Sequence, residues 1–454
     1  MKILKNILFL LLLILVAISV SCSKINKYED AFNTFKDEWI NKDFSGMYSM
    51  LTDSSKEYID EETFVNRYTN IYSAIALKDL KIEISGDIIK NKDYYTIPFS
   101  LKCNTVAGEL DITDYQANIY KVDNEYLIDW NESLLFPDMI EGDKIYVRKS
   151  NHTRGKILDR NDNVLAEDGT ISVVGIHPSK FDTENRDSKI TEIANTLDIS
   201  EDTIINKLNA NSNPEYFVPI VDILSSDEKL TTLINRADEG IIINEKTSRV
   251  YTGGEAFGRL IGYVGAITAE ELESKNDKGY TESSLIGKAG IEQVYEDTLR
   301  GEDGAEIYLS RNNEEISILK KEVINGTDVK LTIDSTLQIN SYEQLNGEKG
   351  AVTAVDPKTG EVLALVSAPS YDSNMFTTYV TKTKAAEREA NDYTDQINRF
   401  SKTYAPGSTM KLITASIGLN TGVLNADETV TIDGLSWQKD SSWGNYNITR
   451  VHNT

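Results

Sequence analysis

Cysteine, histidine and proline are scarce in this chain of 454 residues, and each scarcity narrows the possible classes of protein. Two cysteines cannot form a disulfide framework, and three histidines, at positions 152, 177 and 452, cannot form a clustered metal site. Eight prolines and 27 glycines exclude a collagen-like or low-complexity chain. The 72 acidic residues outnumber the 47 Lys and Arg, and the resulting net charge of −25 disfavours nucleic acid as a partner. The composition, 40% hydrophobic and 26% charged, is that of a globular chain with roughly three domains.

The first 23 residues indicate a membrane-targeting segment. A short basic start precedes residues 7–20, which are apolar apart from Ser19. A helix that spans a membrane needs about 20 apolar residues, and this run is shorter. Its length fits a signal sequence or a short anchor. Cys22 follows small residues and resembles a bacterial lipoprotein cleavage site, while an uncleaved anchor helix remains the alternative. Both interpretations place the chain after about residue 24 on the outer face of a membrane.

Residues 24–141 predict a small α+β domain. One helix face carries aromatic side chains at i, i+4, i+7 and i+11, which are Tyr28, Phe32, Phe35 and Trp39. Short helices are expected over 44–76, and strands around 80–84, 94–101, 108–121 and 125–130, with a hairpin turn at Asp123-Asn124. No clustered acid–base set occurs here, so we interpret this domain as a spacer.

Residues 142–325 form a second, glycine-punctuated block with helices expected around 187–210 and 226–238. Asp159 and the two asparagines that follow it imitate the start of a calcium loop. Val164 at position six and Thr170 at position twelve exclude an EF-hand. The glycines at 287 and 290 lack the spacing and the Ser/Thr of a phosphate loop. A structural role is the better interpretation.

Residues 326–454 form the third block. Alternation predicts a strand over 329–334, and a helix is expected over 335–345. Two strand-like runs, 350–355 and 361–366, are joined by a turn in which Pro357 and Gly360 supply a fixed and a positive φ angle. This pattern predicts a β-hairpin.

One motif in the third block carries chemistry. Pro406-Gly407 precedes Ser408, and the apolar run after it predicts a buried helix that ends near 420–422. Lys411 follows Ser408 by three residues and therefore lies on the same helix face. A serine becomes a nucleophile when a neighbouring base takes its proton, and a lysine in an apolar cleft can act as that base because burial lowers a lysine pKa. Taken alone, Ser-x-x-Lys is also the pattern of an ordinary N-cap serine with a surface lysine.

The ordered motifs resemble a class B penicillin-binding protein, most closely the low-affinity methicillin-resistance type. Ser408-Thr409-Met410-Lys411 is similar to the family's active-site motif. The segments that begin at Arg154 and at Gly287 resemble the signatures of its non-catalytic pedestal, or dimerisation, domain. Those that begin at Asp356 and at Ala368 resemble the opening of its transpeptidase domain. The first block resembles the nuclear-transport-factor-2-like domain of the resistance subtype.

The resemblance implies a multidomain α+β chain: anchor 1–23, NTF2-like domain 24–141, pedestal 142–325 and incomplete transpeptidase domain 326–454. It also implies a D,D-transpeptidase that cross-links peptidoglycan and binds β-lactams through Ser408, with Lys411 as base and with no cofactor or metal. Expected partners are D-Ala-D-Ala stem peptides, β-lactams, the membrane and cell-wall synthesis proteins such as a glycosyltransferase.

The family's later motifs, Ser-x-Asn and Lys-Thr-Gly or Lys-Ser-Gly, do not occur after Lys411. We therefore expect either a partial record or a truncated product, and we expect the 454-residue chain itself to be inert. Two further alternatives are a serine β-lactamase and a non-catalytic β-lactam sensor. The long pedestal argues against the β-lactamase, and the single apolar segment argues against the sensor.

Overall fold

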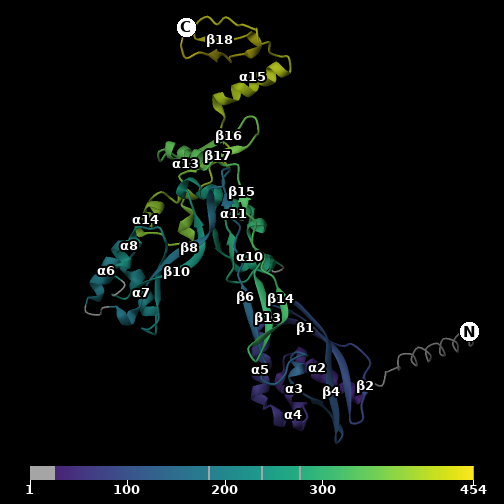
Figure 1. Cartoon of the computed structure of the whole chain (residues 1–454). Helices are drawn as coiled ribbons and strands as arrows, with labels where there is room; N and C mark the ends of the chain where they lie inside the picture. The colour runs from purple at the N-terminus through teal and green to yellow at the C-terminus, as the bar shows by residue number, and fades with distance from the viewer. Residues whose placement is uncertain (1–25, 182–184, 237–238, 276–277, 453–454) are drawn as a thin grey trace, which may run out of the picture. The chain divides into compact units, whose positions relative to one another are not determined.

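The computed structural model describes residues 26–181, 185–236, 239–275 and 278–452, in two units. The first unit ends at Ile397, and the second runs from Asn398 onward (Figure 1). The predicted anchor, 1–23, lies outside the described residues. No helix within the described residues has the length and the apolar character needed to cross a membrane.

The first unit begins with a small domain of helices on a sheet, as the sequence predicts. Its helices are α2 (Lys27–Ile40), α3 (Phe44–Ser49), α4 (Asp53–Tyr58) and α5 (Glu61–Ala74), with a short η1 (Glu132–Leu134). Its strands are β1 (Lys78–Ile84), β2 (Ile89–Lys90), β3 (Tyr94–Thr105), β4 (Gly108–Val122) and β5 (Glu125–Asp129). They form an antiparallel sheet in the order β1-β3-β4-β5, with β2 on β3. The predicted hairpin turn is confirmed, because β4 pairs with β5 and Asp123 between them has a positive φ.

An aromatic core holds this domain together. Phe32, Phe35 and Trp39 of α2 are fully buried, which confirms the predicted helix face. The polar tips of the buried rings are satisfied, because the Trp39 Nε1–H donates to Tyr72 Oη at 2.6 Å and the Trp130 Nε1–H donates to Tyr68 Oη at 3.0 Å. The rings fill the interior between helices and sheet. The interpretation of the domain as a spacer stays a prediction.

The second block is built on two sheets. Its strands are β6 (Lys144–Ser150), β7 (Ile157–Leu158), β8 (Val164–Ile176), β9 (Val218–Leu224), β10 (Ile241–Tyr251), β11 (Val264–Ala266), β12 (Leu285–Gly287), β13 (Gly304–Arg311) and β14 (Glu314–Lys321). The long β8–β10 pair is antiparallel over eleven residues, and β9 pairs with the other edge of β8. A three-stranded sheet in the order β14-β13-β6 packs against the first domain, because Ile307 and Leu309 of β13 belong to the core of that domain. A separate small pair joins β11 to β12.

The helices of this block are short. They are η2 (Pro178–Lys180), α6 (Arg186–Leu197), α7 (Glu201–Ala210), α8 (Lys229–Ile234), η4 (Gly254–Ala256), α9 (Gly258–Ile261), α10 (Ala269–Ser274), α11 (Gly290–Val294) and α12 (Glu296–Leu299). The single helical stretch predicted over 187–210 is two helices. Asp198 takes a left-handed conformation that ends α6, and the Ser200 hydroxyl caps α7. Figure 1 shows α6, α7 and α8 gathered into one lobe beside β10.

The third block begins inside the first unit. It contains β15 (Val329–Lys330), α13 (Ser335–Gln344), β16 (Gly350–Val355), β17 (Val362–Ala368), η6 (Ser373–Phe376), α14 (Lys382–Ala390) and η7 (Thr394–Gln396). The predicted hairpin is confirmed by the antiparallel pairing of β16 with β17, and Gly360 in its turn has a φ of +78°. The strand predicted over 329–334 is only two residues long, because the backbone then turns into α13, which Asp334 caps.

The second unit contains η8 (Gly407–Thr409), α15 (Met410–Asn420), β18 (Ser436–Trp437), η9 (Ser441–Trp443) and β19 (Ile448–Thr449), with β18 and β19 paired. The mixture of helices and sheets in successive domains confirms the predicted multidomain α+β class. The four domain boundaries proposed from the sequence stay a prediction.

Candidate active site

Ser408 lies in the turn that leads into α15. Gly407 begins η8 with a φ of +54°, a left-handed conformation that glycine adopts at little cost. The Thr409 hydroxyl donates to the Pro406 carbonyl at 2.6 Å and fixes the turn. The Pro-Gly lead-in thus places Ser408 immediately before the helix, as the sequence predicts.

Lys411 is the second residue of α15, three positions after Ser408. The structure therefore places the two side chains about one turn apart. Among the described residues, no hydrogen bond joins the Ser408 hydroxyl to the Lys411 ammonium. Catalytic hydrogen bonds are often long before substrate binds, so this spacing is compatible with proton transfer between them.

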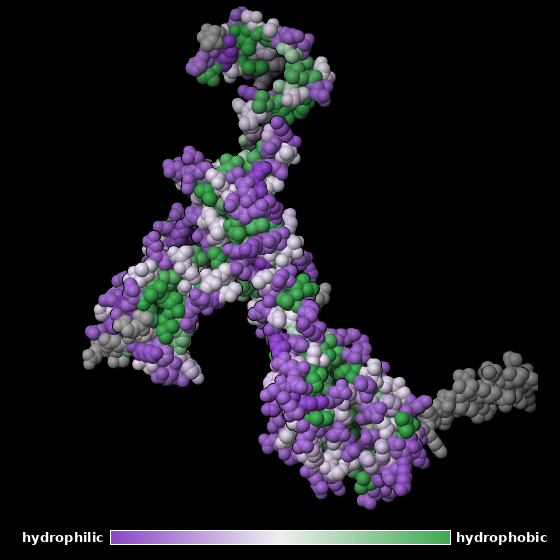
Figure 2. All heavy atoms as spheres, viewed as in Figure 1, coloured by the Kyte–Doolittle hydropathy of each residue, from purple (hydrophilic) through white to green (hydrophobic). Residues whose placement is uncertain are grey.

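Within the second unit, the helix that follows Ser408 is exposed. The run after Ser408 forms a helix, but its side chains are exposed rather than buried, and Leu412 is 78% exposed. Figure 2 shows hydrophobic spheres on the surface of this second unit. The burial of this helix and the apolar cleft for Lys411 stay predictions. An apolar run of this kind indicates that a helix needs a packing partner.

The second block contains a buried cluster of charges whose role the sequence analysis missed. Glu292 is fully buried and accepts hydrogen bonds from Arg154 Nε at 2.7 Å and from Arg249 Nε at 2.8 Å. Arg249, only 2% exposed, also donates to the Gly155 carbonyl at 2.8 Å and to Asp168 at 3.3 Å. Arg154 donates further to Glu296 at 2.7 Å. Each charge has an opposite partner, so the cluster ties β8, β10, α11 and α12 together.

Asp159 connects the second block to the third. Its carboxylate is buried and accepts hydrogen bonds from the Asn161 and Asn163 backbone amides and from the Ser335 hydroxyl, the last at 2.6 Å. Burial acts to raise the pKa of Asp159, but these hydrogen bonds hold that pKa well below its ordinary value. The loop rejected as an EF-hand is thus a carboxylate-centred turn that contacts the first residue of α13.

Within the described residues, neither a free cysteine nor a metal site competes with Ser408. Cys103 is buried, and burial raises the pKa of its thiol to about 11, so it stays protonated. Across residues 26–181, 185–236, 239–275 and 278–452, no group of three His, Cys, Asp or Glu side chains could hold a metal ion.

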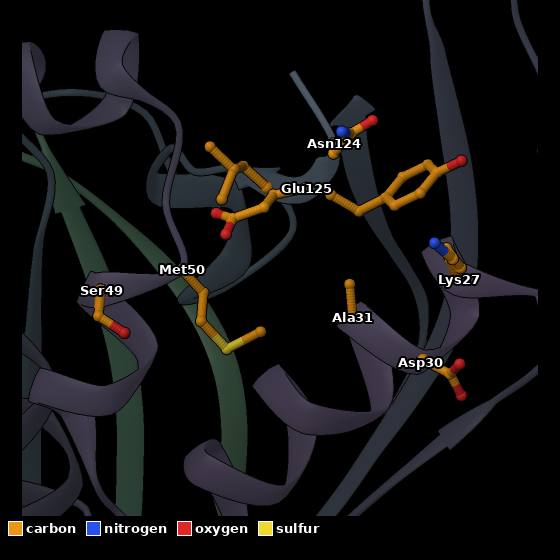
Figure 3. Close-up of a pocket in the computed structure, with 9 residues that line it drawn as sticks. Lys27, Asp30, Ala31, Ser49, Met50, Asn124 and Glu125 are labelled. Atoms are coloured by element: carbon orange, nitrogen blue, oxygen red, sulfur yellow. The ribbon is translucent and has the colours of Figure 1, made fainter. Parts of the chain in front are cut away.

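A surface hollow of about 450 Å³ lies in the N-terminal domain. Figure 3 shows Lys27, Asp30 and Ala31 of α2 on one side, with Asn124 and Glu125 from the β4–β5 turn across from them. These side chains provide no nucleophile with an adjacent base. We therefore assign no chemistry to this hollow.

Three family models match the chain in succession. Residues 27–143 match the NTF2-like N-terminal transpeptidase domain, residues 149–331 the penicillin-binding protein dimerisation domain, and residues 350–454 the penicillin binding protein transpeptidase domain. Ser408 and Lys411 lie within the last of these segments.

Relatives with these domains are longer than this chain. Penicillin-binding protein 3 of Bacillus subtilis is 39% identical over 440 residues, which cover 95% of this chain and 65% of the relative. The peptidoglycan D,D-transpeptidase MrdA of Acinetobacter baumannii is 32% identical over 278 residues, which cover 60% of this chain and 41% of the relative. A solved complex between a penicillin-binding protein and MreC from Helicobacter pylori is 24% identical with a TM-score of 0.48, covering 68% of this chain and 58% of that one. The chain thus spans 65% or less of the length of these proteins.

Proposed function

The chain belongs to the class B penicillin-binding proteins, and from this membership we propose that it forms part of a serine D,D-transpeptidase that cross-links peptidoglycan. One observation carries the proposal. A serine in the turn before α15, with a lysine three residues on, lies in the segment that matches the transpeptidase domain.

In the proposed reaction, the Ser408 hydroxyl oxygen attacks the carbonyl carbon of the penultimate D-alanine of a stem peptide. Lys411 accepts the Ser408 proton, and the Ser408 backbone N–H stabilises the oxyanion. The peptide bond then breaks, and the terminal D-alanine leaves with a proton returned from Lys411. An amine of a neighbouring strand attacks the ester and releases Ser408. A β-lactam acylates the same hydroxyl.

The Ser-x-Asn and Lys-Thr-Gly or Lys-Ser-Gly motifs, which hold substrate in this family, do not occur after Lys411.

We propose that the protein acts at the outer face of a membrane. Residues 1–23 support an anchor or a lipoprotein signal, with Cys22 as the lipidated residue in the second case. The proposed partners are D-Ala-D-Ala stem peptides, β-lactams and glycan-polymerising proteins such as a glycosyltransferase, since cross-linking acts on strands that another enzyme must supply. The NTF2-like segment supports a link to the methicillin-resistance type, which stays a prediction.

Labelling with a fluorescent penicillin tests the proposal, in a chain extended through the later motifs. We expect a covalent adduct that persists after denaturation and is lost in Ser408→Ala. Ser416→Ala, another exposed serine on α15, is the matched control and should label normally. Labelling of Ser408→Ala at the native rate would contradict the proposal, and release of the adduct within minutes would favour a β-lactamase instead.

A further inference from the structure

The helix α14 depends on other elements for its stability. It has nine residues, all within the described part of the chain, and none of them is buried. Helices shorter than about 12–15 residues are marginal in water, and most helical stability in proteins comes from packing against other elements. Figure 1 shows α14 beside the lobe of α6, α7 and α8, and hydrogen bonds join the two. These bonds are therefore candidates for what keeps α14 folded.

The lobe caps the first turn of α14 through Asp198, the residue that follows α6. The Asp198 carbonyl oxygen accepts from the Lys382 backbone N–H at 2.6 Å, and the Asp198 carboxylate accepts from the Thr383 backbone N–H at 3.1 Å. The Thr381 hydroxyl accepts from the Lys384 backbone N–H at 3.2 Å. The first four N–H groups of a helix have no partner within it, and a carboxylate is favoured there by the helix dipole. Two of these four groups are thus bonded by a residue of the lobe.

The backbone of Asp198 indicates that its carboxylate is the reason for its presence. Asp198 ends α6 with a φ of +53° and a ψ of +53°, in the left-handed region. Glycine is the usual residue in this position, because a Cβ makes the left-handed conformation costly. A glycine would therefore suit α6 better, but it would leave the Thr383 N–H without its carboxylate partner. Hydrogen bonding to Thr383 also lowers the pKa of Asp198, so the carboxylate is ionised at neutral pH.

A second contact holds the residue before α14 on the same lobe. The Tyr379 hydroxyl donates to the Leu197 carbonyl at 2.9 Å and accepts from Lys229 Nζ at 3.3 Å. The Tyr379 ring packs against the buried core of the lobe, and its backbone N–H donates to the Asp222 carbonyl of β9 at 3.1 Å. This anchor keeps the start of α14 within reach of Asp198.

The other ion pairs of α14 are weaker candidates. Lys384 pairs with Glu255 of η4 at 2.7 Å, but the two side chains are 43% and 35% exposed, and exposed ion pairs contribute little to stability. Arg388 pairs with Asp395, which lies in the same segment of the chain, so this pair does not attach α14 to another domain.

We propose that α14 is a conditional helix, which is folded only while the lobe of α6, α7 and α8 is docked on it, and that Asp198 is the residue that couples the two. The helix lies in the segment that matches the transpeptidase domain, and the lobe lies in the segment that matches the dimerisation domain. Part of the transpeptidase segment thus depends on the preceding domain for its secondary structure. This dependence does not rest on the proposed enzymatic activity.

Hydrogen–deuterium exchange of the 454-residue chain over a series of urea concentrations tests the dependence. We expect the amides of α14 to be protected without urea, and to lose protection at a urea concentration no higher than the one at which α6 and α7 lose it. Protection of α14 that persists after α6 and α7 have exchanged would overturn the proposal. An α14 without protection in the absence of urea would overturn it as well.

Substitution of Asp198 tests the coupling residue. Asp198→Gly keeps the left-handed backbone and removes the carboxylate, so the amides of α14 should exchange at least about fivefold faster while those of α6 exchange no faster. Asp198→Asn keeps one acceptor oxygen and should have a smaller effect. Asp202→Asn, which changes an exposed carboxylate of α7 in the same lobe, is the matched control and should leave α14 unchanged. Native exchange of α14 in Asp198→Gly, or an equal acceleration of α6 and α14, would overturn the role of Asp198.

Discussion

The substitution Glu292→Gln removes the central anion of the buried charge cluster. The two carboxylate oxygens of Glu292 accept from Arg154 at 2.7 Å and from Arg249 at 2.8 Å, and Glu292 itself is fully buried. A glutamine keeps one acceptor oxygen, but its amide nitrogen then faces an arginine donor. Each charge-assisted hydrogen bond contributes about 1.5–3 kcal/mol, and breaking a buried ion pair costs about 3–5 kcal/mol. We therefore expect Glu292→Gln to lower the free energy of unfolding by about 3–5 kcal/mol.

Urea denaturation followed by two probes measures this loss. Far-ultraviolet circular dichroism reports the whole chain. Tryptophan fluorescence does not report on the cluster directly, because the four tryptophans, at 39, 130, 437 and 443, lie outside the second block. The dichroism transition should move to lower urea, while the fluorescence transition should move less. Glu302→Gln is the matched control, because Glu302 pairs with Lys321 at the surface and should cost less than about 1 kcal/mol. If Glu292→Gln costs no more than Glu302→Gln, the cluster does not stabilise the second block.

Two other substitutions test the contacts between the second and third blocks. The depressed pKa of Asp159 means that its stabilisation is present above its ordinary pKa of about 3.8 and is lost as the pH falls through that value and below it. Asp159→Asn should therefore destabilise the chain at pH 7. It should also make the fall of stability with pH less steep below about pH 4, as measured by urea midpoints at several pH values. An unchanged slope of stability against pH would reject this. In Gly258→Ala the new Cβ would lie 1.7 Å from the Tyr371 carbonyl oxygen, whereas in Gly350→Ala it would meet only the end of the Leu345 side chain at 3.3 Å. We expect Gly258→Ala to lower the free energy of unfolding by about 3 kcal/mol and Gly350→Ala to lower it by under about 1 kcal/mol, measured in the same assay. Equal losses would contradict the close approach of the Tyr371 backbone to Gly258.

Local patterns in the sequence were sufficient for the features whose cause is local. The i, i+4, i+7, i+11 spacing from Tyr28 to Trp39 predicts a helix face, because each residue of a helix rotates by a fixed angle. The Pro-Gly pair before Ser408 predicts the turn into α15, because these residues restrict the backbone wherever they occur. The candidate catalytic pair was found for the same reason, since its spacing is a property of one helix turn.

Local sequence patterns do not reveal which residues far apart in the chain pair or pack with one another. Arg154 and Glu292 are 138 positions apart, and nothing periodic relates them. A buried arginine and a surface arginine look alike in a sequence, so only the fold shows that Arg249 is enclosed. In the same way, the apolar residues of α15 specify that a packing partner is needed but not where that partner lies.

Contacts between the second and third blocks support the structural role that the sequence indicates for the second block. Ser335 at the start of α13 bonds to Asp159, and the Tyr371 backbone lies against Gly258. Farther along, the Tyr379 hydroxyl donates to the Leu197 carbonyl at 2.9 Å, which joins the segment before α14 to the lobe of α6, α7 and α8. These three contacts fall on successive parts of residues 335–379, so the beginning of the transpeptidase segment is held along its length by the second block.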